Sequence, residues 1–292
     1  MTGADSVGKI GIVILNYLNY LDTIECVDSI RQMDYKIAGI VIVDNGSYNE
    51  SYSILGKIYK GDKKICVVRA DKNYGYAKGN NIGIHIARKR FAADFVYVVN
   101  NDVIFKDPEY FKKLLRMYDD ETGVIGSKIQ LKDGSIQPEY MAYISFPEVW
   151  YKYLREWFSR RKKEIWLLGI PPLNEENQRQ ILHGCGLLFT PNYFKYYKGF
   201  YPKTFLYCEE HILFILCQRQ GLQQKYAKDT YIYHKEDRSS GMSFHNDANV
   251  MNEYSFQSYK YVVWCAFQNF LLEKLRGSRR IKIFAGVFKQ SV

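Results

Sequence analysis

Two apolar runs in this sequence each end on a carboxylate. One run stops at Val43 and is followed by Asp44, and the other stops at Val99 and leads through two asparagines to Asp102. In a parallel α/β sheet, ligands bind just beyond the carboxyl ends of the strands. Either aspartate alone is equally typical of a turn or a helix cap. As a pair on neighbouring strands they predict a nucleotide and divalent-metal site, because carboxylate oxygens suit such cations.

Two further segments carry groups that could move a proton or bind a metal. Glu209 and Glu210 are adjacent and open a predicted helix. Neighbouring carboxylates raise at least one pKa, which favours a general base, although acids also simply stabilise a helix N-terminus. His234 ends an apolar strand and is a candidate metal ligand, while a lone histidine is more often structural.

A loop rich in glycine and asparagine runs from Asn73 to Gly83 and leads into a predicted helix. Glycines permit close backbone approach, and a helix N-terminus favours anions. Lys78 adds a positive charge suited to a diphosphate. The loop matches neither the P-loop nor the dinucleotide-binding pattern, so a surface turn is an equal alternative.

The elements that position these residues alternate between strand and helix over the first 122 residues. We expect strands at 10–15, 39–43, 65–68 and 95–99, and helices at 24–33, 51–59 and 77–89. This alternation predicts an α/β protein with a Rossmann-like, mainly parallel central sheet flanked by helices.

After residue 123 the pattern changes. We expect strands at 124–131, 186–189 and 226–233, a helix at 209–220 that ends at Gly221, and a helical C-terminal tail. Residues 147–180 are rich in Trp, Arg, Lys and Glu, and this mixture favours an insertion or a mobile region.

Composition narrows the class of protein. The chain has 292 residues, 47% of them hydrophobic, which is typical of a globular protein. A net charge of +10 favours an anionic partner or, more simply, a solubilising surface. The six cysteines show no C-x-x-C spacing, and no apolar run is long enough to span a membrane or to act as a secretory signal. We therefore expect reduced thiols in a cytoplasmic protein.

Taken in order, these segments resemble the inverting family 2 glycosyltransferases with a GT-A fold, and within them the rhamnosyltransferase-like branch that builds bacterial surface polysaccharides. The resemblance covers about residues 9–245. Its motifs are Val13–Tyr17, Val43–Ser47, Asn73–Gly75, Gly79–Gly83, Asn100–Asp102, Gly184–Gly186, Phe205–Glu210 and Tyr233–His234.

The resemblance implies a catalytic domain at residues 1–252, with a nucleotide-binding half at about 9–122 and an acceptor-binding half at about 123–252. A helical, basic and aromatic tail would occupy 253–292. It also implies transfer of a sugar, with inversion, from a nucleotide-sugar donor such as dTDP-rhamnose or a UDP-hexose. The acceptor would be a saccharide or a lipid-linked saccharide.

The resemblance assigns roles to residues of this chain. Asp44 would bind the nucleotide base, Glu210 would act as the catalytic base, and Glu209 would orient the acceptor. The other nucleotide-binding residues would be Asn16, Asn73, Lys78, Asn81 and Asn101, and Gly184, Cys185 and Gly186 would lie under the sugar. The Mg²⁺ or Mn²⁺ ligands would be Asp102, His234 and Asn100.

Two departures from the family pattern matter. The family usually has Glu-Asp where this chain has Glu209-Glu210, so the base is one methylene longer. The metal motif begins with Asn100 instead of an aspartate, which leaves less negative charge for the cation.

Other readings stay open. A sugar-nucleotide nucleotidyltransferase also uses acidic strand ends and Mg²⁺, but a Gly-rich basic loop after the first strand is missing. A nucleic-acid-binding protein would explain the charge, yet no recognition element is evident apart from the tail, and we expect no nucleic acid partner. The tail, with Trp264 and Phe267 at helical spacing and basic residues after them, could pack on the domain or lie peripherally on the anionic inner face of the cell membrane.

Overall fold

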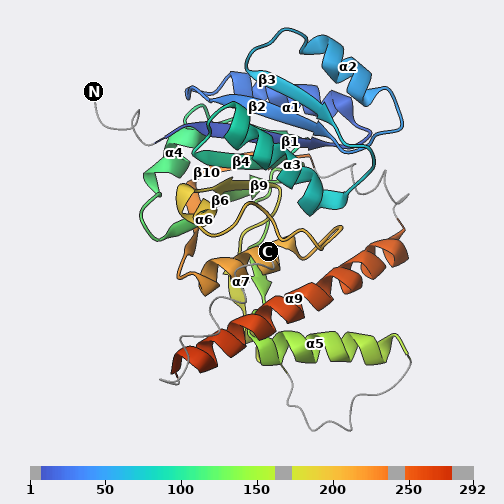
Figure 1. Ribbon diagram of the computed structural model, residues 1–292, viewed down its shortest axis with the longest axis vertical. Coiled ribbons are helices and arrows are strands. Elements are labelled where there is room, and N and C mark those ends of the chain that lie inside the picture. Colours follow the sequence, from blue (N-terminus) through green and yellow to red (C-terminus); the bar gives the residue numbers. More distant parts are fainter. Residues whose placement is uncertain (1–7, 162–172, 236–246, 278–292) are drawn as a thin grey trace.

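The computed structural model describes residues 8–161, 173–235 and 247–277, and its centre is an eight-stranded mixed sheet (Figure 1). The strand order is β3-β2-β1-β4-β9-β6-β10-β5. The strands are β1 Ile10–Asn16, β2 Gly39–Asp44, β3 Ile65–Arg69, β4 Phe95–Asn100, β5 Val103–Ile104, β6 Thr122–Gln130, β9 Gly186–Phe189 and β10 Gln223–His234. A separate two-stranded sheet pairs β7 Tyr140–Ala142 with β8 Arg179–Ile181.

Helices cover both faces of this sheet, and two further helices lie beyond one end of it. They are α1 Tyr20–Arg31, α2 Ser51–Ile58, α3 Gly75–Arg90, α4 Tyr110–Arg116, α5 Phe146–Ser159, α6 Pro191–Phe194, α7 Glu209–Arg219 and α9 Ala248–Gly277, with a 3₁₀ turn, η3, at Glu175–Asn177. The seven elements expected in the first half are confirmed, with ends that shift by a few residues at most.

The sheet combines parallel and antiparallel pairing. Strands β3, β2, β1 and β4 are parallel, β9 is antiparallel to both β4 and β6, and β6 is parallel to β10. Successive side chains of a strand point to opposite faces of the sheet. Because helices cover both faces, side chains on each of them are buried. In β1, Val13 packs toward α3 and α7, whereas Ile12 and Ile14 pack toward α1, α2 and α4. The near-continuous apolar runs of the sequence follow from this double burial.

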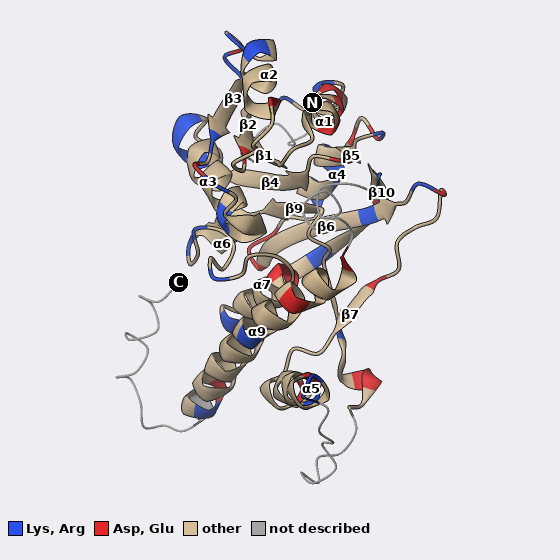
Figure 2. Cartoon of the chain, turned by 90° about the vertical axis from the view of Figure 1, so that its right-hand side faces the viewer, with Lys and Arg blue, Asp and Glu red and all other residues tan. Residues whose placement is uncertain are grey.

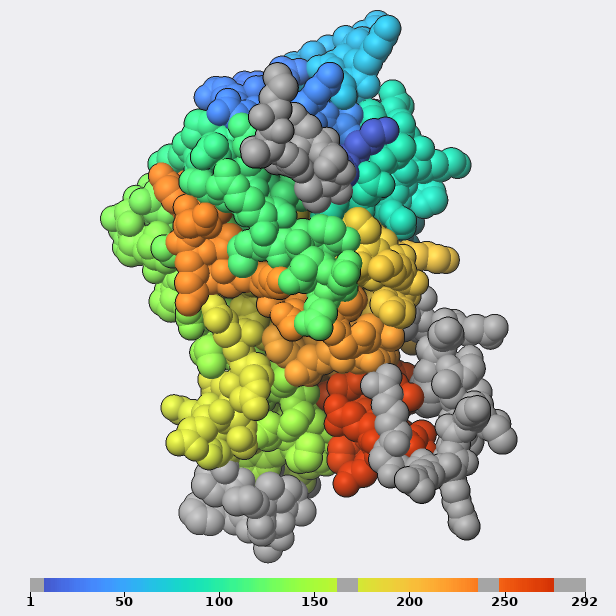
Figure 3. Space-filling view, turned by 90° about the vertical axis from the view of Figure 1, so that its left-hand side faces the viewer, coloured from blue at the N-terminus to red at the C-terminus, as the bar shows by residue number. Residues whose placement is uncertain are grey.

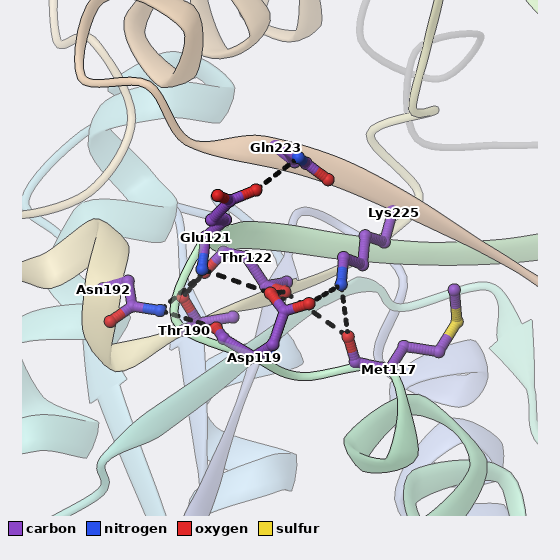
Figure 4. A network of polar contacts seen from close by, with 8 residues as sticks. All are labelled: Met117, Asp119, Glu121, Thr122, Thr190, Asn192, Gln223 and Lys225. Atoms are coloured by element: carbon purple, nitrogen blue, oxygen red, sulfur yellow. Dashed lines mark hydrogen bonds and ion pairs between the residues drawn. The ribbon is translucent and has the colours of Figure 1, made fainter.

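Polar contacts tie the amino-terminal ends of β6 and β10 to the loop after α4 (Figure 4). The Asp119 carboxylate accepts hydrogen bonds from Lys225 Nζ and Thr122 Oγ1, and Asn192 Nδ2 donates to the Asp119 carbonyl at 2.9 Å. The hydrogen bonds from Lys225 and Thr122 lower the pKa of Asp119 to about 2. This network connects segments far apart in sequence and lies at the amino-terminal ends of these strands.

The segment 147–180, expected to be an insertion or a mobile region, contains most of the helix α5, and its residues 162–172 lie outside the described part of the chain. This helix packs against α9, and the two form a layer beyond one end of the sheet (Figures 1 and 3). Val149 is fully buried, Phe146 contacts Phe267 with ring centroids 5.0 Å apart, and Tyr153 stacks on Phe256 at 5.1 Å with ring planes 6° apart. The charged residues between these aromatics obscure the helical pattern in the sequence.

The helical C-terminal tail is confirmed, and it begins at Ala248. Within α9, Val262 and Cys265 are buried, whereas Trp264 is half-exposed. The basic residues expected at the end of the tail, from 276 onward, have side chains outside the described part of the chain. No helix in the described ranges has the length and apolar character that crossing a bilayer requires. Figure 2 shows Lys and Arg spread over several helices in that view.

Candidate active site

Asp44 lies at the carboxyl end of β2, beside the end of β1. Its side chain is fully buried and accepts hydrogen bonds from Asn16 Nδ2 at 2.8 Å and from the backbone N–H of Ser47 at 3.1 Å. Arg69 Nε is 4.0 Å from the carboxylate. Thr23 in turn donates to Asn16 Oδ1 at 2.9 Å, so the side chain of Asn16 is held from both sides. These contacts fix the carboxylate at the strand ends, where it is fully buried and lines neither of the two cavities described below.

The loop before α3 is held against the sheet by Asn45. The Asn45 amide donates to Asn73 Oδ1 at 2.9 Å and to the Gly75 carbonyl at 3.2 Å, and its oxygen accepts from Tyr74 N–H at 3.1 Å. Gly75 has a φ of +78°, and a Cβ there would lie 2.1 Å from the Phe205 carbonyl oxygen. Only glycine allows this approach, which brings the loop beside the segment that carries the glutamates.

Glu209 and Glu210 form the first turn of α7. Tyr207 and Cys208 precede them with φ values of +70° and +68°, a left-handed pair that non-glycine residues rarely adopt. Such strain persists where the surrounding structure enforces it, often at functional sites. The pair turns the chain so that both carboxylates reach the same cavity.

The two glutamates differ in their surroundings. Glu209 is 4% exposed, and burial together with the charge of Glu210 raises its pKa well above the ordinary value. Glu210 is partly exposed and accepts a hydrogen bond from Gly184 N–H at 3.2 Å. Burial raises the pKa of Glu210, and the Gly184 hydrogen bond opposes that rise. A pair with unequal environments suits a division between a neutral acid and an ionised base.

A cavity of about 290 Å³ joins most of the predicted site residues. Its wall includes eight of them: Asn73, Asn100, Asn101, Gly184, Cys185, Glu209, Glu210 and His234. They come from the ends of β4 and β10, the loop before α3, the turn before β9 and the start of α7. The structure thus brings together side chains that are up to 161 positions apart in the sequence.

Asp102 and His234 lie side by side because β5 pairs with the end of β10. The register places His234 opposite Val103, and His234 Nε2 lies 3.2 Å from Asp102 Oδ1. The Asp102 side chain is 8% exposed and that of His234 17%. A carboxylate oxygen and an imidazole nitrogen are both suitable donors for Mn²⁺ or Mg²⁺. Among the described residues no group of three or more His, Cys, Asp or Glu could hold a metal, so a cation here would need further ligands.

A second and larger cavity of about 930 Å³ adjoins the first. The two share His183, Tyr207 and Glu210 in their walls. The larger one is lined by β7, α5 and α9 together with the first turn of α7. Glu210 therefore contributes to the walls of both cavities.

Six predicted residues line neither cavity: Asn16, Asp44 and Asp102, described above, and Lys78, Asn81 and Gly186. Lys78 is exposed on α3 and does not line either cavity. The amide of Asn81 bonds both backbone groups of Phe200 at 2.8 Å, which ties α3 to the loop before α7. Gly186 is buried in β9, where a Cβ would lie 2.4 Å from Tyr97 Oη, so its part in the structure is close packing. Their roles toward a nucleotide or sugar stay predictions.

Sequence reasoning missed several residues of this site. Asn45 holds the loop before α3 through two hydrogen bonds that its amide donates. It lies within the Val43–Ser47 motif, but the sequence assigned it no role. The Tyr76 hydroxyl donates to the Gly184 carbonyl, and His183 lies in both walls with its ring stacked on Tyr140 at 5.1 Å. Burial, and secondarily the charge of His234, lowers the pKa of His183. His183 directly precedes the predicted Gly184, and that adjacency was the available signal.

Comparison with known proteins assigns the family. Residues 10–172, more than half of the chain, match the model of "Glycosyl transferase family 2". The chain belongs to glycosyl transferase family 2. This membership favours sugar transfer over the nucleotidyltransferase alternative. The rhamnosyltransferase-like branch receives no such support.

Relatives and solved structures agree with this assignment. The glycosyltransferase GlyG of Streptococcus pneumoniae is 28% identical over 98 residues, which are 34% of this chain and 31% of that protein. The structure of GalNAc-T7 with UDP, GalNAc and Mn²⁺ has a TM-score of 0.58 at 12% identity, over 79% of this chain and 44% of the other. The mannosyltransferase PcManGT of Pyrobaculum calidifontis, in complex with GDP-Man and Mn²⁺, gives 0.54 at 12% identity, over 93% and 76%. These two likenesses show the GT-A-like fold.

Proposed function

We propose that this chain transfers a sugar, with inversion, from a nucleotide-sugar donor to a saccharide or lipid-linked saccharide acceptor. The observation that carries the proposal is the place of Glu210 in the wall shared by the two cavities. A donor in the smaller cavity and an acceptor in the larger one would meet at this carboxylate. The family membership supports the reaction class.

In the proposed mechanism, Glu210 accepts the proton of the acceptor hydroxyl as that oxygen attacks the anomeric carbon. The bond from this carbon to the donor diphosphate breaks on the opposite face, and the diphosphate leaves with the electron pair. Gly184 N–H holds Glu210 in place at 3.2 Å. Burial and the charge of Glu210 raise the pKa of Glu209 well above its ordinary value, which favours its neutral form and a single negative charge on the pair.

The donor would lie along the strand ends. Asp44, oriented by Asn16, would accept a hydrogen bond from the base, and this contact requires a rearrangement of the strand ends because Asp44 is fully buried and lines neither cavity. Asn73 and Asn101, which line the smaller cavity, would contact the ribose and diphosphate. Lys78 and Asn81 do not line this cavity, so their assignment to the nucleotide depends on a rearrangement of α3. Gly184 and Cys185 would lie under the sugar, with Gly186 packed behind them.

The site fits a divalent metal that takes part of its coordination from the donor. Asp102 and His234 supply one carboxylate and one imidazole 3.2 Å apart, and Asn100 adds an amide beside His234 in the wall of the smaller cavity, which Asp102 itself does not line. Mg²⁺ or Mn²⁺ bound there would supply electrostatic stabilisation of the leaving diphosphate. Two structural neighbours were solved with Mn²⁺. One of these structures contains UDP and the other GDP-Man, so they do not indicate which base the donor nucleotide of this chain carries.

The test is a screen of nucleotide sugars for thermal stabilisation and for donor hydrolysis, with Mg²⁺, Mn²⁺ or EDTA. Glu210→Gln keeps the shape of the side chain and removes the base. We expect it to lower transfer by about 10²- to 10⁴-fold while nucleotide binding is retained. Gln220→Glu, at the far end of the same helix, is a matched control that should leave transfer unchanged. Transfer by Glu210→Gln within twofold of the wild type would overturn the assignment of the base.

The finer expectations are part of the same proposal. They include a rhamnosyltransferase-like donor choice, a role in bacterial surface polysaccharide synthesis, and a cytoplasmic location peripheral to the inner face of the membrane. The division into a catalytic domain at 1–252 with two halves and a tail from 253 is also a proposal. The stretch matched to GlyG covers about a third of each protein. The activity of the whole protein is therefore a proposal and does not follow from that match.

A further inference from the structure

The larger cavity has more room than one acceptor sugar needs. Its volume of about 930 Å³ is roughly three times the 290 Å³ of the smaller cavity. Sites that hold drug-sized ligands usually measure about 300 to 1,000 Å³. A monosaccharide would therefore leave much of the space between α5 and α9 unfilled.

The lining suits the faces of several sugar rings. Aromatic side chains come from α5, α9 and the segments around β7 and α7: Tyr140, Tyr151, Tyr153, Tyr207, Phe256 and Tyr259. Flat apolar rings pack against the C–H faces of sugars, and tyrosine adds a hydroxyl that can bond sugar oxygens. Tyr153 and Phe256 stack on each other and Tyr140 stacks on His183, so sugar rings would pack against the faces and edges that these contacts leave open.

The polar groups of the wall are suited to hydroxyls. Burial, and secondarily the charge of Lys152, lowers the pKa of His211 to about 3, so this ring is neutral at physiological pH. The Tyr140 hydroxyl lies 3.3 Å from His211 Nδ1. Arg155 and Lys152 are exposed on α5 and line the cavity, and Lys152 Nζ lies over the Tyr259 ring at 5.4 Å from its centroid. Arg160 is paired with Glu156 and Glu253.

The direction of the cavity sets the order of contacts. At one side its wall includes Glu210 and His183, which also line the smaller cavity. At the other side its wall includes Arg160, just after the end of α5, and Asn252, near the start of α9. A glycan with one end at Glu210 would therefore have its remaining sugars beside the α5 residues of this wall.

We propose that the acceptor is an oligosaccharide of at least two sugar units, bound along the aromatic cavity between α5 and α9 with its terminal hydroxyl at Glu210. This inference rests on the proposed glycosyl transfer and specifies its acceptor. It gives α5, an element that the sequence did not predict, a task in acceptor selection. Tyr151 is the α5 ring best suited to a test, because it lines the cavity and makes no ring contact with a described residue.

The experiment uses the full chain, the donor found in the screen, and synthetic acceptors of one to four units with the same terminal sugar. Series of glucose, galactose, rhamnose and N-acetylglucosamine residues serve as probes. We expect kcat/KM to rise about tenfold or more from one unit to three, since about 1.4 kcal/mol of added binding corresponds to tenfold. Tyr151→Ala should lower the ratio of trisaccharide to monosaccharide kcat/KM at least threefold. Tyr196→Ala, a half-exposed tyrosine after α6, is the control and should keep the ratio.

The outcomes separate the two proposals. If no nucleotide sugar is hydrolysed or bound, the proposed function fails and the inference fails with it. If the donor is hydrolysed but transfer is equal for one and three units, or occurs to no saccharide of the series, the inference alone is overturned. A ratio that Tyr151→Ala leaves unchanged also overturns the placement of the acceptor along α5.

Discussion

Gly184 offers a sharp test of how Glu210 is positioned. A Cβ added at Gly184 would lie 2.5 Å from Glu210 Oε1 and 3.3 Å from its Cδ. Ordinary contact begins at 3.4 Å, so the carboxylate must move by about 0.9 Å, the difference between 3.4 and 2.5 Å. A displacement near 1 Å in a reacting group can lower the rate by about 10²-fold. We therefore expect Gly184→Ala to reduce kcat by about two orders of magnitude.

The assay measures kcat for transfer together with the melting temperature, with and without donor. Gly56→Ala is the matched control, because a Cβ at that position of α2 meets no atom within 4 Å. It should leave kcat unchanged and add roughly 0.5 to 1 kcal/mol of stability, since alanine is favoured over glycine in a helix. A shorter acid should relieve the contact, so Gly184→Ala with Glu210→Asp should recover part of the lost rate. Near-wild-type kcat in Gly184→Ala, with a normal melting temperature, would refute the reasoning.

Three further predictions concern other parts of the molecule. The folded state lowers the pKa of Asp119 to about 2, so the contribution of this carboxylate to stability is present above pH 3.8 and is lost as the pH falls toward 2. In Asp119→Asn, the free energy of unfolding should therefore depend less on pH between 3.8 and 2, as measured by denaturant unfolding at each pH. Asn45→Leu should loosen the loop before α3 and weaken donor binding about tenfold or more in calorimetry, because buried polar partners lose their hydrogen bonds. His234→Ala should raise the Mn²⁺ concentration that half-saturates donor binding by about tenfold, and an unchanged value would remove His234 from the metal site.

The first half of the fold could be predicted from the sequence because strands buried on both faces of the sheet are continuous apolar runs. Each strand there is a short apolar run, and each ends in polar residues at the sheet edge, as at Asp44 and Asp102. The order of the sheet required the structure, since β9 enters antiparallel between β4 and β6 through contacts distant in sequence. The same long-range pairing of β5 with β10 places His234 beside Asp102.

The α5 helix shows why the rest could not be predicted. Its apolar side is completed only by α9, about 100 residues later, where Phe256 stacks on Tyr153. The helix reads as charged because Lys152, Arg155 and Glu156 line the cavity or face solvent instead of the core. A cavity formed between two distant helices leaves no local pattern in either one.

The choice between the two glutamates follows from the same geometry. Both line the smaller cavity, but only Glu210 also reaches the larger one, and it is the one that backbone N–H of Gly184 orients. Ionisation of one member of a close pair disfavours ionisation of the other. The more buried Glu209 should hold its proton, which leaves Glu210 as the acceptor of the substrate proton. Because burial raises the pKa of Glu210 above its ordinary value of 4.5, kcat/KM should fall as the pH drops through a midpoint above 4.5. Glu209→Gln should keep this fall of kcat/KM at low pH, because a side chain that is already neutral does not titrate there. If the fall is lost in Glu209→Gln, the roles of the two glutamates are exchanged.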